Sequence, residues 1–188
     1  MKNCLVLLFF FATLPMALAQ LQFNPKIGWN KFKYKPADES TLTSTKERGY
    51  QLGADIRIGG ITYLQTGVHF TVLSNRFRSI LIDVNEVEKT QLRAVRVPLS
   101  IGRSFLDVEV FQLHSRIGGV LHLPLAAGEG TLMIDDYEEL NFAATVALGI
   151  EVSRLTFDIQ FEHAVTDFLI TDPNSKYHLW TFSLGYLF

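Results

Sequence analysis

The chain has little cysteine and, after its first residues, no long apolar run. Its one cysteine among 188 residues is Cys4, near the N-terminus, so a processed chain would contain no disulfide. No later apolar stretch approaches the ~18 residues of a membrane-spanning helix. The 17 basic and 19 acidic residues are dispersed, without a long basic run. We therefore expect no disulfide framework, no transmembrane helix and no binding to nucleic acid.

Motifs for catalysis and metal binding are also lacking. No G-x-S-x-G nucleophile elbow occurs. The five histidines show no spacing typical of metal ligands: His69, His114, His122, His163 and His178. We therefore expect no catalytic residue, no metal and no cofactor. One alternative stays open, a lipid-modifying enzyme that uses His163 and Ser175 at the rim of a barrel.

The first 19 residues are organised like a secretory signal peptide. Lys2 supplies a positive charge, an apolar core follows, and a small-x-small cleavage site ends at Ala19. The 16-residue apolar run contains Pro15 and is shorter than the ~20 residues of a spanning helix. The sequence therefore predicts a signal peptide, 1–19, and an exported domain, 20–188.

Apolar and polar residues alternate in eight segments, which is the pattern of a β-strand with one apolar face. In the last segment Trp180, Phe182, Leu184, Tyr186 and Phe188 alternate with Thr181, Ser183 and Gly185. The other expected strands are 26–34, 49–58, 61–73, 92–103, 108–118, 141–152 and 155–165. Long connections at 35–48, 74–91, 119–140 and 166–176 alternate with short turns at 59–60, 104–107 and 153–154. An even number of strands with this alternation is typical of outer-membrane barrels.

Three segments depart from simple alternation. Phe32 and Tyr34 lie on the opposite parity from Ile27, so we expect a bulge or an early strand end near Asn30. Pro98 cannot donate to a ladder, which predicts a second bulge. The apolar residues 120–125 either extend the fifth strand above the membrane or offer a protein-contact surface.

The polar faces of the strands are small and carry charges of both signs. A solvated face would be rich in Lys and Glu, as expected for the alternative of a soluble, secreted ligand-binding β-barrel. We predict instead that the charges pair as an ion network inside the lumen: Asp55, Arg57, Arg96, Arg116, Glu151, Asp158 and Glu162. Aromatic residues near strand ends would form two interfacial girdles: Tyr50, Tyr63, Phe142, Phe157, Trp180, Tyr186 and Phe188.

Four features together point to one family: the signal peptide, the opening segment 27–30, the Gly-spaced segment 147–149 and the aromatic C-terminus 184–188. With them the chain resembles the small outer-membrane β-barrels of Bacteroidetes-type bacteria, the PorT-like proteins, and is distantly similar to the OmpX and OmpA barrels. The resemblance implies an outer-membrane location, contact with membrane lipid, and recognition by the barrel-assembly machinery. The implied assembly signal is Trp180, Phe182, Leu184, Tyr186 and Phe188.

The expected fold is all-β, an eight-stranded antiparallel transmembrane β-barrel with short periplasmic turns and long extracellular loops. A barrel of this size has a lumen filled by side chains, so it is not a general diffusion porin. We expect a non-enzymatic protein whose surface loops serve binding, adhesion or envelope integrity. The PorT resemblance implies an alternative, a membrane component of a protein secretion apparatus. A surface protein or a secretion-system protein is therefore the expected partner.

Deleting Phe188 is expected to impair assembly, because the terminal aromatic residue belongs to the implied assembly signal. The measurement is the amount of heat-modifiable protein in outer-membrane fractions, compared between boiled and unboiled samples. Normal insertion of the truncated chain would contradict the assembly signal.

Overall fold

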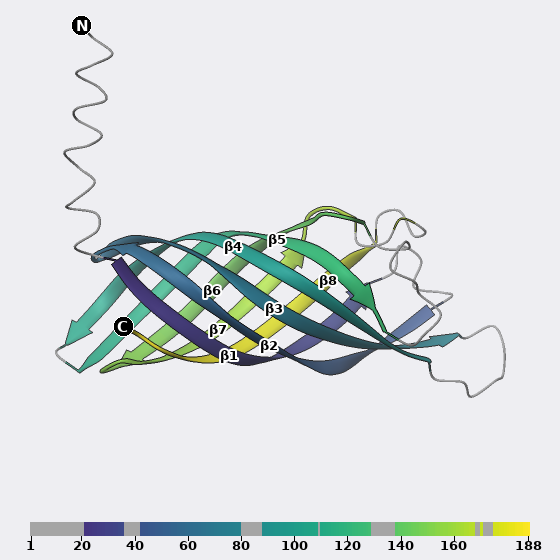
Figure 1. Cartoon of the computed structure of the whole chain (residues 1–188), viewed down its shortest axis with the longest axis horizontal. Helices are drawn as coiled ribbons and strands as arrows, with labels where there is room; N and C mark the ends of the chain where they lie inside the picture. The colour runs from purple at the N-terminus through teal and green to yellow at the C-terminus, as the bar shows by residue number, and fades with distance from the viewer. Residues whose placement is uncertain are drawn as a thin grey trace, which may run out of the picture.

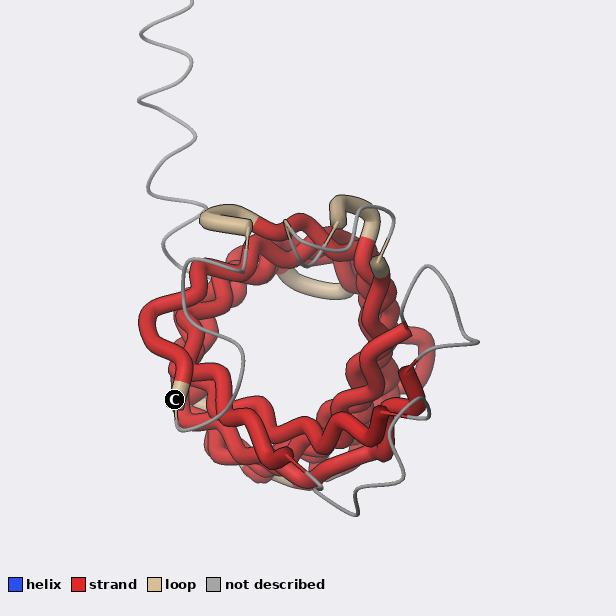
Figure 2. The backbone as a smooth tube through the Cα atoms, turned by 90° about the vertical axis from the view of Figure 1, so that its right-hand side faces the viewer, coloured by secondary structure: helices blue, strands red, loops and turns tan. Residues whose placement is uncertain are grey.

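Eight antiparallel strands close into a barrel (Figures 1 and 2). The computed structural model describes residues 21–35, 42–79, 88–108, 110–128, 138–167, 170 and 175–188, so the predicted signal peptide lies outside the described residues. The strands are β1 (Leu21–Lys35), β2 (Leu42–Gly59), β3 (Thr62–Ser79), β4 (Glu88–Val108), β5 (Phe111–Ala127), β6 (Asn141–Val152), β7 (Leu155–Ala164) and β8 (Lys176–Tyr186). The prediction of an eight-stranded antiparallel barrel is confirmed.

Each strand pairs with its sequence neighbours, and β1 pairs with β8 to close the ring. The turns after β2, β4 and β6 are short and gather at one end, together with the start of β1 and the end of β8 (Figure 1). We call this the inner end, and the opposite end the outer end. At the inner end Gly59 has a φ of +128°, which favours glycine, and the turn that follows is Gly60–Ile61.

The strands run further than the hydrophobic alternation predicted. β4 has 21 residues and β2 and β3 have 18 each, whereas β7 has 10. Much of the predicted long connections is therefore strand, including the apolar segment 120–125 within β5. The predicted turn 104–107 is also strand, because β4 continues to Val108. Pairing between strands uses only backbone groups, so it can continue where apolar and polar residues no longer alternate in the sequence.

The register does not change at Pro98, so the predicted bulge there is wrong, although the β3–β4 ladder leaves out Val97 and Pro98. Pro98 pairs with Val120 without a register shift. The β4 bulges lie instead between Arg93 and Ala94 and between Ser104 and Leu106. The Thr66 hydroxyl donates to the Pro98 carbonyl over 2.8 Å, so the carbonyl at this position is still used. A proline within a strand is therefore accommodated without a change of register.

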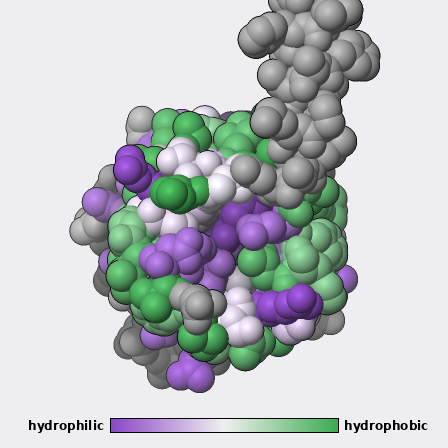
Figure 3. Space-filling view, turned by 90° about the vertical axis from the view of Figure 1, so that its left-hand side faces the viewer, coloured by the Kyte–Doolittle hydropathy of each residue, from purple (hydrophilic) through white to green (hydrophobic). Residues whose placement is uncertain are grey.

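Large apolar side chains cover the outside of the barrel. Burial alternates at every residue of β6, whose outward residues include Val146 and Leu148. Viewed from the inner end, hydrophobic surface surrounds a hydrophilic centre (Figure 3). The outward apolar surface reaches from the Phe23–Phe188 contact at the inner end to the Trp29–Phe182 stack, midway along β1 and β8. We call it the apolar belt.

The aromatic residues divide between the belt and the interior. Six of the seven residues predicted for girdles are exposed: Tyr50, Phe142, Phe157, Trp180, Tyr186 and Phe188. Tyr63 is the exception and corrects the prediction, because its ring is buried in the lumen with the Arg57 guanidinium 4.2 Å from the ring centroid. None of the described residues forms a helix long and apolar enough to cross a membrane.

Candidate functional site: a charged lumen beneath an apolar plug

The inward face of the barrel carries buried charges in equal numbers. Among the described residues, four buried cations face four buried anions: Lys26, Arg57, Arg96 and Arg116 against Asp55, Glu151, Asp158 and Glu162. Strand parity places them there, since each is next to at least one apolar residue of the opposite parity in its strand. Buried charges are costly unless they are paired, so the pairing of this set decides whether the barrel is stable.

The network nearest the inner end joins opposite walls. Arg57 on β2 donates to Glu151 on β6 over 2.5 Å. The His114 ring on β5 lies between two carboxylates, 3.2 Å from Glu151 and 3.2 Å from Asp158. A side chain at Gly149 would collide with both the His114 ring and the Asp158 carboxylate, so glycine is required for this close approach. Small residues on β6 thus leave room for the charges.

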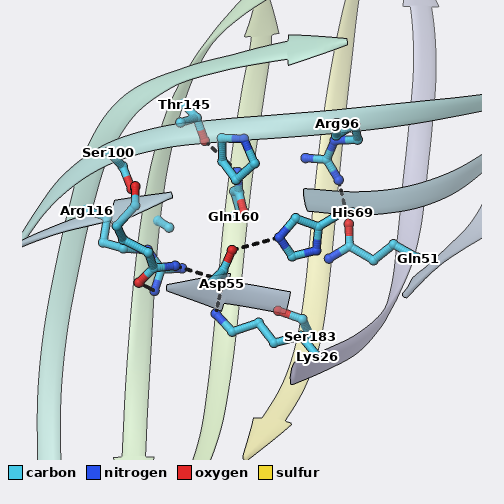
Figure 4. Close-up of a pocket in the computed structure, with 13 residues that line it drawn as sticks. Lys26, Gln51, Asp55, His69, Arg96, Ser100, Arg116, Thr145, Gln160 and Ser183 are labelled. Atoms are coloured by element: carbon cyan, nitrogen blue, oxygen red, sulfur yellow. Dashed lines mark hydrogen bonds and ion pairs between the residues drawn. The ribbon is translucent and has the colours of Figure 1, made fainter. Parts of the chain in front are cut away.

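The central network is built around Asp55 and Asp158, and Figure 4 shows Asp55 with its partners Lys26 and His69. The Lys26 ammonium on β1 lies 2.9 Å from Asp55 on β2 and 2.6 Å from Asp158 on β7. Asp158 also pairs with Arg116 over 2.9 Å. The second Asp55 oxygen is 2.8 Å from His69 Nε2, so this carboxylate has partners on both oxygens. One lysine thus couples the strand next to β1 on one side with the second strand away on the other side.

The network nearest the outer end is an ion pair between Arg96 on β4 and Glu162 on β7. His122 lies 2.9 Å from the other Glu162 oxygen. Arg96 also donates to the Gln51 side-chain carbonyl over 2.5 Å, and Gln160 donates to Glu162 over 2.9 Å. Both charges therefore have additional neutral partners, which a fully buried pair needs in order to offset its desolvation.

The space left in this part of the lumen is small. The cavity that Lys26, Asp55, His69 and Arg96 help to line measures about 20 Å³. A cavity holds a water molecule only from roughly 10–15 Å³ upward, so this one has room for about one water. The side chains therefore fill this part of the interior.

An apolar cluster, which we call the apolar plug, lies beyond the charges at the outer end. It consists of Phe32, Leu73, Leu92, Ala143, Ala164, Tyr177 and Leu179. The Tyr177 ring packs 5.3 Å from the His122 ring and 5.6 Å from the Phe32 ring, so the plug rests directly on the outer ion network. Phe32 keeps the inward parity of Lys26, and the expected bulge near Asn30 is wrong. The apolar residues change parity along β1 because the lumen changes from polar to apolar, so that large apolar side chains point inward at the outer end.

All seven residues of the predicted lumen network are buried in the interior, and each contacts an opposite charge. The prediction left out Lys26 and the histidines His69, His114 and His122, which take part in the same networks. Parity could have found Lys26, since it alternates with the outward Ile27. The choice of partner for each charge depends on how far the strands are shifted relative to one another around the barrel, and the sequence does not show this shift.

The two residues of the rim alternative occupy different environments. His163 is exposed on the outside of β7, and its ring stacks on His178 with the centroids 4.8 Å apart. Ser175 is fully buried. Within the described ranges, no three His, Cys, Asp or Glu side chains are placed to hold a metal ion.

The residues of the implied assembly signal form the outward face of β8 and the chain end. Trp29 of β1 stacks on Phe182 with the ring centroids 5.8 Å apart, and Phe161 of β7 contacts Trp180 at 4.8 Å. Phe188 continues the pairing beyond β8, because its amide donates to the Phe23 carbonyl over 2.9 Å. The terminal residue therefore takes part in closing the barrel.

Comparison with known proteins identifies the fold. No protein-family model and no curated protein sequence matches the chain. Among solved structures, the outer membrane protein OprG from Pseudomonas aeruginosa aligns at a TM-score of 0.55 and 12% identity, covering 89% of this chain and 95% of that one. Neisserial surface protein A (NspA) aligns at a TM-score of 0.53 and 11% identity, covering 87% and 96%. At these identities the likeness shows a shared fold.

Glu162→Gln is expected to lower the free energy of unfolding by about 3–5 kcal/mol, because it leaves the buried Arg96 without its counter-charge. The matched control is Asp167→Asn, which removes the partner of Lys176 from a partly exposed pair and should cost about 0–1 kcal/mol. Urea unfolding in lipid vesicles measures both. Equal effects of the two substitutions would contradict a stabilising outer network.

Proposed function

We propose that the chain is a non-enzymatic outer-membrane barrel with a closed lumen, which works by binding a partner at its outer end. Two features together support the proposal. Side chains fill the interior, and several strands continue past the apolar belt. The outward apolar surface and the fold shared with OprG and NspA support an outer-membrane location.

The filled interior argues against transport through the barrel. Beneath the apolar plug the described charges are paired, and the cavity that Lys26 and Asp55 help to line measures about 20 Å³. An ion crossing the lumen would have to break pairs such as Arg96–Glu162 and then pass through buried hydrocarbon. The interior is accordingly a structural core, and the surfaces that remain for a function are the outside of the wall and the outer end.

The outer end is asymmetric and carries a projecting sheet. Strands β2 to β5 remain paired beyond the belt, which gives the outer extension, residues 42–46, 75–79, 88–92 and 123–127. The β5–β6 ladder ends at His122–Asn141, five residues before β5 ends at Ala127. Leu123 and Leu125 are exposed on this segment. Apolar side chains beside a strand edge favour recognition of a protein segment by strand addition.

The other readings of the sequence would use different features. Lipid modification would need a nucleophile beside a base, whereas His163 is exposed and Ser175 is buried. A role in a secretion apparatus, implied by the resemblance to PorT, would use the same outer extension with a secretion-system protein as its partner. A role in envelope integrity would need no partner protein.

The purified barrel is expected to show no steady ion conductance in planar lipid bilayers, because the lumen is filled and plugged. A general porin inserted under the same conditions serves as the positive control. Stable ohmic steps from the heat-modifiable form of this chain would contradict a closed lumen.

A photo-crosslinking residue at Leu125 is expected to yield a protein adduct on intact cells, because Leu125 lies on the outer extension. The matched control is the same residue at Ile117, which is 66% exposed on the same strand within the belt and should crosslink to lipid only. Gel shifts with and without lipase distinguish the adducts. A Leu125 adduct that contains only lipid would contradict binding of a protein at this surface.

A further inference from the structure

A group of three cations and two histidines lies on the outside of the wall, near the outer end of β1 and its neighbours. Lys31 and Lys33 are exposed and share the outward parity of Trp29 on β1. Arg48 on β2 is opposite Lys31 in the ladder and is also exposed. On β8, His178 is opposite Lys33 and contacts His163 of β7. We call these five residues the basic patch.

The patch borders the aromatic upper edge of the apolar belt. Lys31 is opposite Trp180 in the β1–β8 ladder, and its ammonium lies 5.9 Å above the Phe182 ring. Phe182 in turn stacks on Trp29. Aromatic residues of this kind mark the interface between hydrocarbon and headgroups. The cations therefore stand at the level where lipid headgroups begin, and they point away from the barrel axis.

The outward face of β5 does not share this character. On β5, at the outer end, the outward residues are Leu121, Leu123 and Leu125, all exposed. At the border of the basic patch, Lys176 is already paired with Asp167 over 2.9 Å. The basic patch thus lies on β7, β8, β1 and β2, whereas the outward face of β5 is apolar and β4 carries one exposed cation, Arg93, at this end.

We infer that the basic patch binds the phosphate groups of anionic lipids in the outer leaflet and holds the barrel at a fixed depth and orientation there. The inference rests on the proposed outer-membrane location. Lys31 and Arg48 converge from paired strands, and Lys33 with the stacked histidines supplies further N–H donors one step higher. Clustered cations beside a membrane surface attract anionic headgroups in this way.

The position of the patch favours a lipid over a soluble anion. A soluble polyanion would be met best by cations that face the aqueous solution above the barrel, whereas these project sideways from the wall. The exposed rings of Trp29 and Trp180 directly below would contact the acyl chains of the same lipid. The phosphate groups and the acyl chains of one lipid would thus contact adjoining surfaces. A soluble phosphate compound has no acyl chains and would contact only the basic patch.

The test measures lipid binding to the folded, detergent-solubilised protein by native mass spectrometry. The probe is bisphosphorylated lipid A, and dephosphorylated lipid A is the comparison. Lys31→Gln/Lys33→Gln is expected to weaken binding of the probe about 30-fold, since each cation at a membrane surface contributes about fivefold. The matched control is Arg103→Gln/Arg154→Gln, which removes two exposed cations near the inner end and should change binding less than about twofold.

The outcomes separate the inference from the proposed function. The lipid site is contradicted if lipid A with and without phosphates binds equally well, or if the control variant loses as much affinity as Lys31→Gln/Lys33→Gln. Neither result contradicts the outer-membrane barrel. Inositol hexakisphosphate that displaces the lipid at equal concentration also overturns it, in favour of a soluble polyanion. If the wild-type protein shows no heat-modifiable band, the outer-membrane barrel itself is contradicted and the lipid site with it.

Discussion

The structure depends on one constraint, that each backbone amide and carbonyl inside hydrocarbon must find a partner within the protein. A sheet satisfies this only when its first and last strands meet, as β1 and β8 do over ten residue pairs from Lys26–Gly185 to Lys35–Lys176. Closure in turn creates an interior that lipid cannot fill. With eight strands that interior is just wide enough for side chains, so what fills the lumen follows from the closing of the wall.

Filling the lumen with charge rather than hydrocarbon lets the two faces of a strand differ. If both faces were apolar, nothing would specify which one meets the lipid, whereas buried Asp55 and Arg57, alternating with outward Ile56 and Ile58, fix the orientation of β2. The cost of burying these charges is offset by pairs that cross the lumen. Arg57 on β2 reaches Glu151 on β6, four strands away around an eight-stranded ring, so one contact ties opposite walls.

Parity predicted most of this arrangement, and its failures have physical causes. The β6 face from Ala143 to Glu151 could be predicted because apolar and small residues alternate without a break. The inward orientation of Phe32 could not be predicted, because the prediction assumed that the whole lumen is polar. Residues 42–46 were missed as strand because, above the belt, no hydrophobic face is needed. The pairing of Arg96 with Glu162 depends on the stagger between β4 and β7, which only the closed structure supplies.

The lumen network also bears on the order in which the barrel folds. Arg57 and Glu151 are 94 residues apart in the chain, and Lys26 and Asp158 are 132 apart. Contacts of such separation form late, after local hairpins such as β2–β3 and β6–β7. Until then Lys26 and Asp55, on the neighbouring strands β1 and β2, can pair, but the other six charges have no partners, and an open sheet carrying them cannot enter hydrocarbon at low cost. Closure and insertion therefore have to occur together, which gives this chain a single cooperative step of membrane entry rather than a strand-by-strand one.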